Sequence, residues 1–272
     1  MIAHRAERRF EATYRRNPEG IIIGAEPLLL RGTRPGAVLV LHGYNDSPQA
    51  MASMAGALHD AGWTAYAPLL PGHGRTLQAF AESGAADWIR GAREAYARLR
   101  RDHEAVAVCG LSMGGALAFL LAAEEEEVRA VVGIAPYLRL SGPMRVLLAL
   151  SPVAELGAKY VSGGGQRSVH DPEAADRMIA YRQSTPHLLR ELSLVAHRAF
   201  DALPRVSQPV LFVQSREDNR IPSRLAEEAF ARIGSDDKVL EWRAGAGHVL
   251  TVDYGHDEVE RMVVAWLAGH FG

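Results

Sequence analysis

The stretch "VAVCGLSMGG", residues 106–115, runs from small and apolar residues directly into a serine between glycines. The apolar run predicts a buried strand, and "MGGALAFLLAAE" after it predicts a helix. Gly110-Leu111-Ser112-Met113-Gly114 therefore matches the G-x-S-x-G nucleophile elbow, a sharp strand-to-helix turn with the serine at its apex. Glycines belong there because the chain approaches itself too closely for a Cβ. We interpret Ser112 as a nucleophile; the alternative is a surface turn that contains serine.

A serine nucleophile needs a base within hydrogen-bond reach, and that base is in turn oriented by an acid. With this elbow, the partners follow in the order serine, acid, histidine. Asp218 follows the predicted strand "PVLFVQS", and His248 follows the predicted strand "VLEWRA". We predict Asp218 as the acid and His248 as the base, with Glu217 as the alternative acid because loop registers are uncertain by about a residue.

The oxyanion formed on attack at an acyl carbonyl needs two preorganised donors, and backbone N–H groups serve this purpose. The amide of Met113, directly after the nucleophile, is predicted as one of them. The loop after the strand "AVLVLHG" supplies the other, which is placed at Tyr44. His42 and His73 lie in glycine-bordered loops upstream of the serine and are predicted to make structural hydrogen bonds.

Short apolar runs alternate with helical patterns along most of the chain, which is typical of a mostly parallel sheet covered by helices. Residues 137–204 break this alternation with several helix-like pieces, and we predict that they form a cap or lid inserted into the core. The core is then 1–136 and 205–272, with 1–20 as an N-terminal extension. The predicted strands are 21–31 (interrupted at Pro27), 37–43, 64–70, 105–110, 130–136, 209–215 and 239–244.

Composition excludes several function classes. The chain has 272 residues and a formal net charge of −2, so nothing directs it generally to nucleic acid or an anionic membrane. Its single cysteine, Cys109, forms no internal disulfide and is expected to be a small core residue. The charged N-terminus lacks the apolar core of a signal peptide, which predicts a cytoplasmic protein without stable membrane insertion. The predominance of arginine over lysine hints at a bacterial origin.

The segments "LHGYNDSP", "PLLPGHG", "CGLSMGG", "REDNRIP" and "GAGHVLTVDYGHDEV" together resemble the α/β-hydrolases, specifically small bacterial carboxylesterases and monoacylglycerol lipases. The resemblance covers about residues 30–270. It implies an α/β-hydrolase fold with a mostly parallel eight-stranded sheet, a small inserted cap, and no cofactor or metal. It also implies hydrolysis of carboxylic esters with short to medium acyl chains, or of monoacylglycerols.

The predicted function is thus a serine hydrolase that cleaves a small lipophilic ester through an acyl-enzyme intermediate. Thioesterase, lactonase, amidase and carbon–carbon hydrolase activity stay as alternatives, since one fold and one triad host many reactions. A catalytically silent binding module is the alternative outside enzymes. The oligomeric state is open between monomer and homodimer. A lipophilic acyl chain is favoured by apolar residues of the predicted lid, namely Met144, Val146, Leu147, Leu148 and Leu150.

Overall fold

The computed structural model describes residues 2–142, 148, 160–162 and 168–271. Within these ranges the core is a seven-stranded sheet in the order β1-β3-β2-β4-β5-β8-β9. All neighbouring strands are parallel except β1, which pairs antiparallel with β3. The strands are β1 (Leu28–Leu30), β2 (Ala37–Leu41), β3 (Thr64–Ala67), β4 (Val106–Leu111), β5 (Val128–Ile134), β8 (Val210–Ser215) and β9 (Lys238–Arg243).

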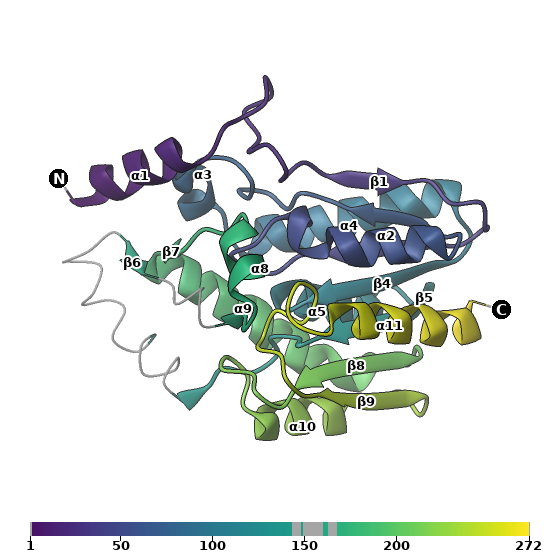
Figure 1. The fold of residues 1–272 in the computed structure, drawn as a ribbon. Helices are drawn as coiled ribbons and strands as arrows, with labels where there is room; N and C mark the ends of the chain where they lie inside the picture. Colours follow the sequence, from purple (N-terminus) through teal and green to yellow (C-terminus); the bar gives the residue numbers. More distant parts are fainter. Residues whose placement is uncertain (1, 143–147, 149–159, 163–167, 272) are drawn as a thin grey trace.

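Helices cover both faces of this sheet (Figure 1). One face is packed by α2 (Ala52–Asp60) and α11 (His256–His270), whose buried Met54, Leu58, Val263 and Leu267 belong to one apolar cluster. A second cluster, on the opposite face, contains buried residues of α4 (Ala85–Asp102), α5 (Met113–Glu124), α9 (Pro186–Ala202) and α10 (Ser223–Arg232). The remaining elements are α1 (Ile2–Thr13), η1 (Pro48–Met51), α3 (Leu77–Glu82), β6 (Val161–Ser162), α8 (Pro172–Arg177), β7 (Gln183–Ser184) and η3 (Leu203–Arg205).

The predicted α/β-hydrolase fold class is confirmed, with seven strands described in this sheet where the resemblance implied eight. The difference lies in the segment 21–31. Only Leu28–Leu30 forms a strand there, while Ile22 makes an isolated antiparallel bridge to Arg16. Pro27 interrupts the run because proline cannot donate a ladder hydrogen bond. Gly24, at φ 94°, turns the chain before that strand.

The central helix α5 is pressed unusually close to the sheet at the elbow. A Cβ on Gly110 would collide with the carbonyl of Gly114, and one on Gly114 would collide with the carbonyl of Leu41. All residues of α5 from Met113 to Ala122 are buried, because α4 and α9 flank the helix on the side away from the sheet. The sequence is accordingly apolar all round.

The N-terminal extension packs on its own chain. Phe10 of α1 stacks on Tyr181 at 4.8 Å between ring centroids, and Tyr181 stacks on Phe80 of α3 at 4.2 Å. Within 137–204, α9 packs against α4 and α5, and the short β6 and β7 pair antiparallel. Of the predicted lid residues, Leu148 packs on the second apolar cluster, the one that contains residues of α4, α5, α9 and α10. Outside the described residues lie Met144, Val146, Leu147 and Leu150.

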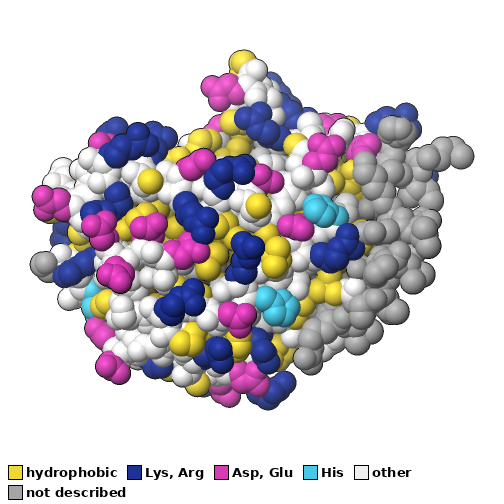
Figure 2. Space-filling view, turned by 180° about the vertical axis from the view of Figure 1, so that it is seen from behind, with side chains coloured by type: hydrophobic (Ala, Val, Ile, Leu, Met, Phe, Trp, Pro, Cys, Tyr) yellow, Lys and Arg dark blue, Asp and Glu magenta, His cyan; other side chains and the backbone are white. Residues whose placement is uncertain are grey.

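The surface carries both charge signs in mixture. Figure 2 shows basic and acidic side chains interspersed over the visible face, in keeping with the net charge of −2. In the described part of the chain, every helix is too short or too polar to cross a lipid bilayer. Cys109 is fully buried in β4 as predicted, and burial raises the pKa of its thiol to about 12.

Replacement of Gly110 by alanine is expected to lower the free energy of unfolding by about 2 kcal/mol or more, because rigid backbone lies where the new Cβ would be. Urea denaturation at neutral pH measures this change. Gly56→Ala is the matched control. Gly56 lies in α2 with open space at its Cβ position, so alanine there leaves stability unchanged or raises it by up to about 1 kcal/mol. Equal stability of Gly110→Ala and the wild type would contradict the close packing.

Candidate active site

Ser112 occupies a strained turn between β4 and α5. Its φ of 53° and ψ of −114° lie outside the regions that L-residues ordinarily adopt. The turn is held by two bonds to the end of β5: the Ser112 amide donates to Ile134 (2.9 Å), and the Tyr137 amide donates to the Ser112 carbonyl (2.9 Å). Such strain persists only where surrounding structure compensates it, and here it directs Ser112 toward the loops at the carboxyl ends of the strands.

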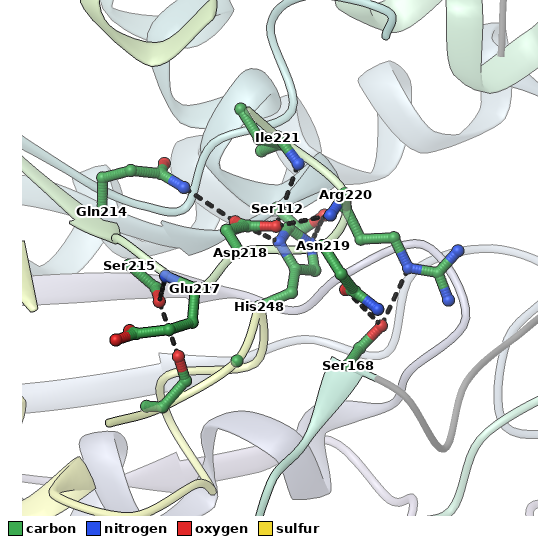
Figure 3. Close-up of polar contacts among 12 residues, drawn as sticks. Ser112, Ser168, Gln214, Ser215, Glu217, Asp218, Asn219, Arg220, Ile221 and His248 are labelled. Atoms are coloured by element: carbon green, nitrogen blue, oxygen red, sulfur yellow. Dashed lines mark hydrogen bonds and ion pairs between the residues drawn. The ribbon is translucent and has the colours of Figure 1, made fainter. Parts of the chain in front are cut away.

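His248 and Asp218 form one continuous hydrogen-bonded chain with Ser112 (Figure 3). The distance from Ser112 Oγ to His248 Nε2 is 2.8 Å, and from His248 Nδ1 to Asp218 Oδ2 it is also 2.8 Å. An ionised carboxylate only accepts, so Nδ1 carries the proton and Nε2 accepts from the serine hydroxyl. The structure thus brings the predicted nucleophile, base and acid together from three separate loops.

Asp218 is held as an anion. Burial alone would raise its pKa, but the charge and hydrogen bond of His248 and the amides of Ile221 and Arg220 outweigh burial and lower it. Asp218 Oδ1 accepts from the Arg220 and Ile221 amides at 2.7 and 2.9 Å, and Oδ2 also accepts from Gln214 Nε2 at 2.7 Å (Figure 3). These four donors fix the carboxylate and keep it charged at neutral pH.

Glu217, the alternative acid, points elsewhere. Its Oε2 accepts from the amide of Gly245 at 3.1 Å, and the residue is exposed. Ser215, two residues earlier, donates to the carbonyl of Ala246 at 2.6 Å. Both contacts join the loop after β8 to the loop that carries His248, so Glu217 helps to connect the two loops and does not contact the imidazole.

The peptide between Gly43 and Tyr44 is oriented by a buried histidine. His42 Nδ1 donates to the Gly43 carbonyl (2.9 Å), while His42 Nε2 accepts from the Leu70 amide (3.2 Å). Burial, and next the charge of His73, hold the pKa of His42 well below its ordinary value, which keeps this neutral arrangement. Because the peptide is trans, the Tyr44 N–H points opposite to the carbonyl that His42 binds.

His73 fixes the following peptide, since its Nε2 donates to the Tyr44 carbonyl at 2.7 Å. Burial lowers the pKa of His73 to about 4, so this ring too is neutral. The structural roles predicted for His42 and His73 are therefore confirmed. Met113, the other predicted oxyanion donor, is the first residue of α5, where the N–H has no intrahelical acceptor.

The Tyr44 side chain belongs to a buried aromatic group. Its ring lies 5.3 Å from Phe80 and 5.8 Å from Trp88 between centroids, and its hydroxyl shares a 2.6 Å hydrogen bond with Ser184 Oγ. The ring thus connects the loop after β2 to the segment before α9.

Asp253 is a buried positioning residue that no sequence pattern indicated. Its fully buried carboxylate accepts from the amides of Gly247 (2.7 Å), His170 (2.8 Å), Asp171 (2.9 Å) and Tyr254 (2.9 Å). Burial alone would raise its pKa, but these four amides lower it below the ordinary range. Asp253 therefore fastens the residue before His248 to the start of the segment containing α8. Its position five residues after His248 carries no local pattern that would have revealed this.

Asp253→Asn is expected to reduce the free energy of unfolding by about 2–4 kcal/mol at neutral pH, because an amide cannot satisfy four N–H donors as a carboxylate does. The folded pKa is depressed, so the contribution is fully present above the unfolded value of about 3.9 and is lost as pH falls through the folded pKa. Urea titrations at about pH 7 and pH 3 measure the difference.

Asp257→Asn is the control for this pair of titrations. Asp257 is exposed, and its partners in the described residues are Arg261 and nearby backbone, so its replacement is expected to change stability little at either pH. If the difference in free energy of unfolding between wild type and Asp253→Asn stays constant from pH 7 to pH 3, the role of the ionised carboxylate is contradicted.

In the described ranges, no three His, Cys, Asp or Glu side chains are grouped so that they could hold a metal ion. The chemistry of the site is that of a hydroxyl, an imidazole and a carboxylate, which together can activate the hydroxyl for attack on an electrophilic centre of a substrate.

Comparison with known proteins identifies the family of the chain. The family model described as "Serine aminopeptidase, S33" matches residues 32–254, a stretch that includes all three residues of the hydrogen-bonded chain. The chain belongs to this α/β-hydrolase family.

Individual relatives cover nearly the whole chain. The thermostable monoacylglycerol lipase of Bacillus sp. (strain H-257) is 27% identical over 252 residues, which are 93% of this chain and 98% of the lipase. The carboxylesterase of Bacillus subtilis (strain 168) is 26% identical over 251 residues, covering 90% and 97%. A solved structure from work on the metagenome-derived lipolytic enzymes LipS and LipT superposes with a TM-score of 0.84 at 32% identity, covering 92% of this chain and all of that one.

Proposed function

We propose that this protein is a serine hydrolase that cleaves carboxylic esters with short to medium acyl chains, or monoacylglycerols, through an acyl-enzyme intermediate. The observation that carries the proposal is the hydrogen-bonded chain from Ser112 through His248 to Asp218, with the serine at a strained elbow. The family membership and the names of the relatives, a monoacylglycerol lipase and a carboxylesterase, support the same reaction class.

The proposed reaction begins when Ser112 Oγ attacks the ester carbonyl and gives its proton to His248 Nε2. The Met113 and Tyr44 amides hold the resulting oxyanion, and the anionic Asp218 stabilises the imidazolium. His248 next protonates the leaving alcohol, which departs and leaves the acyl group on the serine. Water, activated by the same histidine, then attacks the acyl-enzyme and releases the carboxylic acid.

The binding of the Tyr44 peptide supports its role in this scheme. The Gly43 carbonyl and the Tyr44 N–H belong to one peptide, and His42 fixes that carbonyl. The N–H therefore requires no reorientation when the oxyanion develops. Preorganised donors of this kind contribute more to rate than donors that must turn toward the charge. Amide cleavage is the second candidate reaction, because the family model carries the description of an aminopeptidase.

Ser112→Ala is expected to lower kcat for p-nitrophenyl butyrate by about 10⁴-fold or more, because no nucleophile remains. Hydrolysis followed at 400 nm over a series of acyl lengths measures this and shows the chain length that the pocket prefers. A p-nitroanilide of the same acyl group separates ester from amide cleavage. Turnover retained by Ser112→Ala would refute the nucleophile. Absence of any turnover, with Ser112 still labelled by a fluorophosphonate, would direct the search to thioesters, lactones or carbon–carbon bonds.

Asp218→Asn is expected to reduce kcat by about 10³–10⁴-fold, because a neutral amide no longer stabilises the imidazolium or selects the Nδ1–H tautomer. Glu217→Gln is the matched control, since Glu217 bonds the Gly245 amide and not the imidazole. Its kcat is expected to stay within a few-fold of the wild type. A larger loss in Glu217→Gln than in Asp218→Asn would reverse the assignment of the acid.

Four further expectations stay predictions. They are the cytoplasmic location, the bacterial origin, the state of monomer or homodimer, and the division into a core of 1–136 and 205–272 with a cap at 137–204. Phe10 is buried against Tyr181 of the same chain, which supports packing of the N-terminal extension on its own chain and not on a second copy.

A further inference from the structure

Asp46 is a buried acid beside the active site that the proposed reaction does not use. It follows Tyr44 by two residues, and only 8% of it is exposed. Its amide donates to the Gly43 carbonyl (3.4 Å), which turns the chain back on itself. A Cβ on Gly43 would collide with Asp46 Oδ2 and would lie 3.6 Å from Ser112 Cβ. The carboxylate and the serine therefore lie on the same side of Gly43.

The Asp46 carboxylate has no internal partner in the part of the chain that the structure describes. None of those residues donates a hydrogen bond to it or forms an ion pair with it within 4.0 Å. Burial raises the pKa of Asp46 to about 6, and the charges of His248 and Arg220 act in the opposite direction. Arg220 is bound through its Nε to Ser168 Oγ at 2.8 Å. Neither Asp46 oxygen is among the fully buried, unpartnered side-chain atoms of the described residues, so the carboxylate can be reached from the site. A donor that approaches it there forms a charge-assisted hydrogen bond.

The charge of Asp46 also bears on catalysis. At neutral pH it is mostly ionised, and it stands on the loop whose Tyr44 amide is proposed to hold an oxyanion. A bare anion there opposes the negative charge of the transition state, whereas one that is already paired with a substrate donor opposes it less. The arrangement therefore favours a substrate that brings its own donor.

The position of His248 indicates which part of the substrate meets this acid. In the proposed reaction His248 Nε2 protonates the leaving oxygen, so the alcohol portion of the ester lies beside the imidazole. The segment that follows Asp46 is bound to the loop that carries His248, because Thr251 Oγ1 donates to the Ala50 carbonyl at 2.7 Å. The Asp46 loop therefore lies on the His248 side of the serine, which is the side of the leaving alcohol.

We propose that Asp46 is a specificity residue that accepts a hydrogen bond from a donor, a hydroxyl or an ammonium group, on the alcohol portion of the ester. The inference rests on the proposed ester hydrolase function and assigns to Asp46 a preference within it, for esters whose alcohol carries a donor. Monoacylglycerols are one such group, and esters of amino alcohols are another.

Three butyrate esters with the same acyl group test this: propyl butyrate without a donor, 1-monobutyrin with hydroxyl donors, and 2-(dimethylamino)ethyl butyrate with an ammonium donor. kcat/KM is measured at about pH 7, with active enzyme counted by fluorophosphonate titration. The wild type is expected to prefer at least one donor ester over propyl butyrate. In Asp46→Ala, the ratio of that donor ester to propyl butyrate is expected to fall by about tenfold to a hundredfold, because a hydrogen bond to a charged group is lost.

Two further variants sharpen the result. Asp46→Asn keeps an acceptor oxygen without charge, so it retains part of a hydroxyl preference and loses an ammonium preference, which distinguishes the two donors. Ser47→Ala is the control for disturbance of the loop, since the Ser47 hydroxyl is buried without a partner in the described residues, and its ratios are expected to match the wild type.

Two outcomes would overturn the inference while the proposed function stands. In one, Asp46→Ala loses activity on all three esters in the same proportion, as a structural residue would. In the other, the wild type shows no preference for either donor ester. If the wild type hydrolyses none of these three esters and no ester of the p-nitrophenyl series, the ester hydrolase function itself is refuted, and this inference with it.

Discussion

The contact between α5 and the middle of the sheet sets the backbone of Ser112. Gly110 and Gly114 allow the helix to approach β4 and β2 so closely that the connecting residue must adopt φ 53°. A non-glycine residue there costs about 1–3 kcal/mol in backbone strain. That cost is offset by the burial of α5 from Met113 to Ala122 between the sheet and its flanking helices. Packing of α5 in the core therefore positions the Ser112 hydroxyl, and the rigid core holds it in place.

The other groups of the site come from loops, and these are fixed by polar contacts to backbone. Asp218 receives two amides of its own loop, and Asp253 receives four amides from three segments. His42 and His73 each bind a carbonyl of the loop that follows β2. Buried charged or neutral polar side chains thus replace secondary structure as the means of holding irregular backbone. The loops of Tyr44 and His248 are anchored by residues other than the ones proposed to take part in the chemistry, whereas Asp218 serves both purposes.

Sequence patterns predicted the elements of the core well, because strand and helix periodicity report directly on which face is buried. The strands predicted at 105–110 and 209–215 are observed at Val106–Leu111 and Val210–Ser215, and both are buried along their whole length. The elbow motif and the order of residues likewise led to Ser112, Asp218 and His248, which the structure brings into one chain of hydrogen bonds.

Side chains that hold distant segments together and belong to no motif were not found this way. Asp253 acts on residues more than 80 positions away. The carboxylate of Asp46, which has no partner among the described residues, is recognisable from its position over Gly43. No periodicity or local motif encodes either arrangement.

Cys109, three residues before the elbow serine, gives the molecule a built-in reporter. It is the only cysteine in the chain, it is fully buried in β4, and burial holds its thiol in the protonated form. A maleimide can react only after the central strand has separated from its neighbours, because the thiolate is the reactive species. The rate of alkylation of the unmodified protein therefore measures how often the middle of the sheet opens, without any introduced label.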